Sequence, residues 1–184
     1  MLQIITPDIQ EQYDEKNNEF FTIRSQTFNL EHSLISISKW ESKWEKPFLD
    51  DSYEKTTDEI LDYIRCMIVP TKGLDMRAIN YLSEKNVEDI SNYINAKMTA
   101  TWFSKQKTSK SGAGEKVTSE LIYYWMTAFN IPFECEKWHI NRLLTLIRIC
   151  ELKNQPSKKM DKKAIYDQNR ALNAARRARS RSKG

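Results

Sequence analysis

The sequence is poor in glycine, with only four among its 184 residues. Sandwiches and barrels of β-strands need many glycine-rich turns, so this scarcity favours a helical fold. Cysteine is also scarce, and the odd number and wide spacing of Cys66, Cys135 and Cys150 exclude a disulfide framework. No apolar run reaches membrane-spanning length, and the first residues do not resemble a signal peptide. We therefore expect the protein in a reducing cytoplasm.

Recognisable catalytic machinery is missing as well. The chain has two histidines, His32 and His139, and contains no P-loop, G-x-S-x-G, dinucleotide-binding or H-E-x-x-H motif. Its acidic pairs fall at turns and helix starts, where carboxylates usually cap helices or stay solvated. The sequence therefore predicts a binding protein without a cofactor, and not an enzyme.

One pair of residues has a spacing that suits metal ligands. Cys135 and His139 are four residues apart, which would place both on one face of a helix. Zinc usually takes four ligands from closely spaced pairs, and the other two cysteines have no such neighbour. We interpret the pair as a cysteine at a helix start and a hydrogen-bonded histidine in or at the boundary of the core, and predict no metal site.

Charge is divided unevenly along the chain. Residues 153–184 contain eleven basic and two acidic side chains, a net charge of +9, whereas residues 1–152 contain 18 basic and 23 acidic side chains, a net charge of −5. A basic end attracts nucleic acid, an anionic surface or an acidic protein surface, including the acidic body of another copy. It is also a common solubilising end, so the charge alone leaves these alternatives open.

The periodicity predicts an α+β fold that is mainly α. Strands are expected over 2–5, 10–13, 20–23 and 27–30, with a hairpin around the polar loop 14–18. From Ser33 the period becomes helical, and Thr56 with Glu59 forms a capping box for a second helix. Two shorter helices over 74–82 and 87–96 and a short strand over 99–103 follow.

The second half of the chain is predicted to be helical apart from a lysine-rich loop at 105–116. Thr118 caps one helix, and a helix over 136–152, apolar nearly all round, is placed at the centre of a bundle. A linker over 154–159 leads to a last helix that starts near Asp161, followed by a frayed arginine-rich end. These features divide the chain into a β-rich segment (1–32), a helical body (33–153) and a basic helix and tail (154–184).

Candidate partner-binding residues are of two kinds: aromatic side chains beside the lysine-rich loop, and basic side chains near the C-terminus. They are Trp102, Phe103, Lys158, Lys159, Arg170, Arg176, Arg177, Arg179 and Arg181. Trp102 and Phe103 are expected to be the most exposed aromatic pair, while the other tryptophans have the helical spacing of core residues. No aromatic side chain interrupts the arginine run, so base stacking is not predicted there.

Five stretches of the sequence carry a resemblance to a known group of proteins: LEHSL at 30–34, SKWESKW at 38–44, SELIYYWM at 119–126, IPFEC at 131–135 and KWHINRLLTLIR at 137–148. They resemble proteins from long-tailed phages that occupy the position of the tail assembly chaperone. The resemblance covers most of the chain outside the lysine-rich loop.

The resemblance implies a non-catalytic scaffold in the host cytoplasm that coats the tape-measure protein while tail-tube subunits polymerise around it. Such chaperones are often made in two lengths by translational frameshifting. We expect a tape-measure protein as the partner, with self-association between the acidic body and the basic end, and no membrane partner. The alternative is a nucleic-acid-binding module that uses the basic end, for which affinity would fall steeply with salt.

Overall fold

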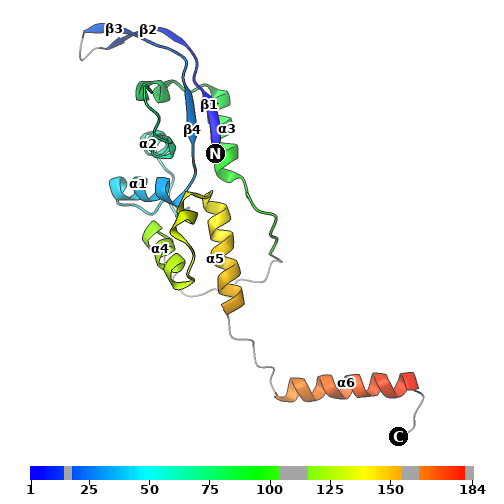
Figure 1. The fold of residues 1–184 in the computed structure, drawn as a ribbon. Helices are drawn as coiled ribbons and strands as arrows, with labels where there is room; N and C mark the ends of the chain where they lie inside the picture. The colour runs from blue at the N-terminus through cyan, green and yellow to red at the C-terminus, as the bar shows by residue number, and fades with distance from the viewer. Residues whose placement is uncertain (15–17, 104–115, 155–161, 181–184) are drawn as a thin grey trace. The chain divides into compact units, whose positions relative to one another are not determined.

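The computed structural model describes residues 1–14, 18–103, 116–154 and 162–180. The chain forms two compact units, Met1–Glu151 and Leu152–Gly184, which are described separately. The first combines short antiparallel strands with several helices, and the second contains one helix (Figure 1). The predicted α+β class, mainly α, is confirmed. Within the described ranges, no helix is both long enough and apolar enough to cross a membrane.

All four predicted strands are present. Strands β1 (Leu2–Ile5) and β4 (Thr27–Leu30) pair antiparallel, with Ile4 opposite Phe28 on the buried face. Strands β2 (Ile9–Asp14) and β3 (Glu19–Ile23) form the expected hairpin. Asn18, directly before β3, has the left-handed backbone conformation that asparagine tolerates.

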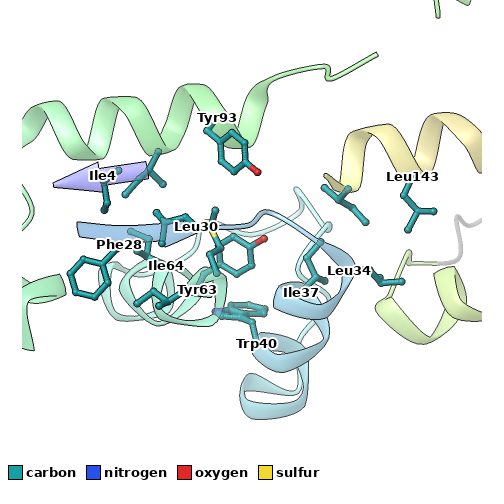
Figure 2. Close-up of a cluster of buried hydrophobic side chains, with 14 of the residues drawn as sticks. Ile4, Phe28, Leu30, Leu34, Ile37, Trp40, Tyr63, Ile64, Tyr93 and Leu143 are labelled. Carbon is teal, nitrogen blue, oxygen red and sulfur yellow. The ribbon is translucent and has the colours of Figure 1, made fainter. Parts of the chain in front are cut away.

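The end of β4 and the residues that follow it, 29–32, are hydrogen-bonded to two distant segments of the first unit. On one side, the Glu31 amide donates to the Met67 carbonyl (2.8 Å) and the Val69 amide donates to the Asn29 carbonyl (2.9 Å). Further along, the Ile140 amide donates to the His32 carbonyl (2.9 Å). The buried side chains of this region come from strands and helices distant in the sequence (Figure 2), and they include Phe28, Leu30, Leu34, Ile37 and Trp40, all fully buried.

Helices α1 (Leu34–Trp44) and α2 (Thr57–Met67) pack against each other. Both start with a capping box, at Ser33 and at Thr56, and the latter is the box predicted from sequence. Trp40 fills the space between the two helices, and its indole N–H donates to the Glu59 carbonyl at 2.9 Å. This bond satisfies the one polar atom of the tryptophan side chain inside the core.

The following region differs from the prediction in two places. The expected helix at 74–82 is a 3-10 helix, η1 (Met76–Tyr81), followed by the α-helix α3 (Glu84–Asn95). The expected strand at 99–103 is wrong, because these residues have no regular structure. The backbone of Met98 is left-handed, which turns the chain at the point where a strand would begin.

The prediction for the second half placed one helix incorrectly. Helix α4 (Ser119–Ala128) is capped by Thr118 as expected, but residues Phe133–Lys137 form a 3-10 helix, η2, and α5 runs from Ile140 to Asn154. Only three α5 side chains are buried: Ile140, Leu143 and Ile147. Helix α5 therefore packs through one face and is not the centre of a bundle; the fully buried Trp40 and Ile37 belong to α1.

The second unit contains helix α6 (Lys162–Ser180). The prediction that the arginine-rich end is frayed is wrong for Arg176, Arg177 and Arg179, which continue the helix. Alanine-rich sequence explains this result, because alanine and arginine are both strong helix formers. The predicted linker beyond Asn154 and the loop at 105–115 lie outside the described residues.

Candidate protein-binding groove

An apolar groove lies between α4 and α5. Its volume is about 410 Å³, and its walls are one face of each helix: Trp125 and Phe129 from α4, and Leu144, Ile147, Arg148 and Glu151 from α5. Trp125, Phe129 and Leu144 are only half-buried. Helix α4 packs against α1 and only weakly against α5, which leaves these apolar side chains incompletely covered.

A buried carboxylate fixes the position of α4. Glu41 of α1 is almost fully buried, and its two oxygens accept hydrogen bonds from the backbone amides of Phe48 (2.8 Å) and Ser119 (2.7 Å). Ser119 is the first residue of α4, where the amides lack helical partners and the helix dipole favours a negative charge. Glu41 therefore holds the start of α4, the helix that carries Trp125 and Phe129, against α1.

Charged side chains lie at one edge of the groove. Arg148 and Glu151 are exposed and line it beside Ile147. The guanidinium of Arg148 also lies 4.3 Å from the ring centroid of Phe103, so residue 103 is placed next to α5. The arrangement is an apolar floor with charges of both signs at its rim, which suits an amphipathic helix rather than a small polar substrate.

The two predicted aromatic residues have different surroundings. Trp102 is 78% exposed, with the Lys97 ammonium 4.1 Å from its ring centroid, whereas Phe103 is half-buried. The expectation of an exposed aromatic pair therefore holds for Trp102 alone. Phe103 is partly covered because Arg148 packs on its ring.

The predicted basic residues are on α6 where they are described. Arg170, Arg176, Arg177 and Arg179 are all exposed there. Lys158, Lys159 and Arg181 lie outside the described residues. The structure gives no relation between α6 and the groove, because they belong to different units.

A second hollow, of about 450 Å³, lies over two buried polar side chains, His32 and Tyr63. His32 Nδ1 is hydrogen-bonded to the Tyr63 hydroxyl, and the His32 ring meets the His139 ring edge-on at a centroid distance of 4.9 Å. The other residues that line the hollow are Phe48, Leu49, Asp51, Lys55, Ile60, Ile94, Asn95 and Asn141. The sequence does not predict that the two histidines are close to each other. They come together where the Ile140 amide donates to the His32 carbonyl.

His139 has a structural role at the start of α5. Its Nε2–H donates to the Tyr93 carbonyl (2.9 Å), while its Nδ1 accepts from the Asn141 amide (3.3 Å). This arrangement requires the neutral ring, and burial lowers the pKa of His139. Cys135 lies in η2 rather than on the same α-helix, so the helical spacing proposed for a metal pair does not occur. Over the described ranges, no cluster of three or more metal-ligating side chains is found.

The histidine cluster predicts that acid destabilises the fold. Burial, reinforced by the neighbouring His139, lowers the pKa of His32 from 6.5 to about 3. Below pH 6.5 the unfolded chain takes up a proton that the folded protein excludes, so stability is present above pH 6.5 and is lost as the pH falls. One such histidine should cost about 2 kcal/mol between pH 6.5 and pH 5.

Urea unfolding at pH 5, 6 and 7 would measure this loss. The His32→Asn variant, which keeps a polar partner for Tyr63, should show a flatter dependence of the unfolding free energy on pH. Since His32 and His139 are the only histidines of the chain, the double variant should remove most of the dependence above pH 5. Equal stability of the wild-type protein at pH 5 and pH 7 would contradict the expectation.

Sequence analysis did not identify the groove. The helical spacing of the tryptophans predicts core positions, yet Trp125 is only half-buried, whereas Ile122 and Met126 on the same helix are fully buried. One sequence signal for the groove is the apolar face of α4, which is wider than a single neighbouring helix covers. Comparisons with protein-family models, curated proteins and solved structures give no significant match.

Proposed function

We propose that the chain is a non-catalytic morphogenesis protein of a tailed phage, which acts in the host cytoplasm as a tail assembly chaperone. Its client is a helical segment of the tape-measure protein, and the segment docks in the groove between α4 and α5. The observation that carries the proposal is the incompletely covered apolar wall formed by Trp125, Phe129 and Leu144.

The physical requirement of the client supports this assignment. A long helix that waits for its tube exposes apolar stripes, and uncovered stripes associate with one another. A groove between two helices can receive such a stripe through side chains spaced at i, i+3 and i+4. Arg148 and Glu151 at the rim would set the register of the docked helix by pairing with its charged side chains.

The test is the affinity of the full chain for synthetic helical segments of the tape-measure protein encoded in the same phage genome. Replacing Trp125 by alanine removes the largest side chain of the groove. We expect binding to weaken roughly 30-fold, which corresponds to about 2 kcal/mol for an aromatic anchor. Isothermal titration calorimetry would measure the change.

The matched control is Tyr124→Ala. Tyr124 is the preceding residue on α4, is 65% exposed and does not line the groove. It should leave affinity within about twofold, because it points away from the docked helix. Thermal unfolding of both variants separates lost binding from lost folding, and Leu144→Asn tests the opposite wall. Equal effects of the Trp125 and Tyr124 substitutions, or no binding by the wild-type chain, would refute the proposal.

A further inference from the structure

Helix α6 concentrates positive charge on a regular scaffold. Its nineteen residues include six basic side chains and one acidic side chain, Asp167, a net charge of +5. Because the helix continues to Ser180, the arginines have fixed directions around its axis. One long face contains Tyr166, Asn169, Arg170, Asn173 and Arg177, which together line a single shallow hollow.

We propose that this face of α6 binds double-stranded DNA in the major groove. The face combines the side chains that recognise nucleic acid by hydrogen bonding: arginine pairs with phosphate oxygens or guanine, and asparagine pairs with adenine. Tyr166, 70% exposed, adds a hydroxyl and an aromatic ring to the same face. This inference is independent of the proposed binding of a tape-measure helix, because it concerns the other unit.

The spacing of the face fits a duplex. Arg170 and Arg177 are seven residues apart, which is about 10 Å along an α-helix and about three base-pair steps along B-form DNA. Beside its arginines and asparagines, the face carries the small residue Ala174, which is exposed and lines the same hollow. A helix with short side chains there can enter a major groove about 12 Å wide.

The chemistry favours nucleic acid over an acidic protein surface. Protein interfaces are anchored by large apolar side chains, and the residues that line the proposed face offer only the exposed ring of Tyr166 and the small methyl group of Ala174. Leu172, the large apolar residue described on α6, is outside the set that lines the hollow. The face offers charge and paired amides, which complement phosphates and base edges.

The chain supplies a charge-matched test. Arg170 and Arg179 are nine residues apart, which places them on opposite sides of α6, and both are exposed. Arg170→Ala and Arg179→Ala each remove one positive charge. Neither should unwind the helix, because alanine is the strongest helix former. Circular dichroism of the full chain would check this.

Fluorescence anisotropy of a labelled 20-base-pair DNA would measure affinity at several salt concentrations. We expect Arg170→Ala to weaken binding about tenfold and to reduce the salt slope by about one, whereas Arg179→Ala should change affinity less than about threefold. Equal effects of the two substitutions would overturn the proposal, as would absence of binding near 150 mM salt.

Four unlabelled competitors identify the ligand class. Unlabelled duplex DNA should displace the probe more strongly than single-stranded DNA of the same sequence, duplex RNA or polyglutamate. Equal displacement by polyglutamate would assign α6 to acidic protein surfaces, including the acidic body of another copy. Stronger displacement by single strands or RNA would exclude docking in a DNA major groove, because neither presents a wide major groove.

Discussion

Replacing Trp40 by alanine is expected to lower the free energy of unfolding by about 4 kcal/mol, the range found when a fully buried tryptophan is truncated. Trp40 has no exposed surface, and its ring contacts Trp44 and Phe48 at centroid distances of 6.2 and 5.2 Å. The substitution also removes the hydrogen bond that the indole donates to the Glu59 carbonyl in the core. Denaturation with urea, followed by circular dichroism, would measure the difference.

Trp44→Ala is the natural comparison, because it removes the same side chain one helical turn further along α1. Trp44 is half-buried, and its indole N–H donates to the carboxylate of the buried Asp62 (3.0 Å). Its loss should cost about half as much, since less apolar area leaves water in the folded state. If Trp40→Ala costs no more than Trp44→Ala, Trp40 is not the centre of the core.

Glu41→Ala should destabilise the protein by about 3 kcal/mol, even though the residue is charged. The change leaves two backbone amides, those of Phe48 and Ser119, without acceptors, and each hydrogen bond to a charged group contributes about 1.5–3 kcal/mol. Because Ser119 begins α4, the same change should loosen one wall of the groove and weaken client binding.

Two other variants define the role of Glu41. Glu41→Gln keeps one carbonyl acceptor and should lose about half as much stability as Glu41→Ala. Glu88→Ala removes a carboxylate from an exposed position of α3 and should change stability by less than about 0.5 kcal/mol. Hydrogen exchange of the Ser119 amide offers a local readout. Unchanged protection of this amide in Glu41→Ala would show that the carboxylate does not hold α4.

Features encoded by neighbouring residues could be predicted from the sequence. The four strands follow from short β-branched and aromatic runs, and α2 follows from Thr56 and Glu59, whose side chains satisfy each other's backbone amides without help from the rest of the fold. Helix α5 was harder, because its start at Ile140 depends on the His32 carbonyl and on a histidine cap. The His32 carbonyl comes from a distant part of the chain, and histidine is not among the residues that usually cap a helix start.

The candidate sites depend on arrangements between elements. The spacing of apolar residues such as Phe129 along a helix is the same whether a neighbouring helix covers them or leaves a groove beside them. Only the placement of α4 against α1, rather than against α5, separates the two cases. On α6, the composition predicts the positive charge but not how it is distributed around the helix axis. The arginines are assigned to particular faces only because the helix continues through the arginine run.

The pairing of residues 29–33 with two distant segments has a consequence for biosynthesis. Met67 and Val69 follow soon in the chain, so the strands and the first two helices can associate while translation is still under way. The partner of His32, Ile140, emerges much later, and until then the apolar surface that the buried α5 side chains Ile140, Leu143 and Ile147 cover stays exposed. A nascent chain stalled before residue 140 would therefore expose this apolar surface to the ribosome and to chaperones that bind nascent chains.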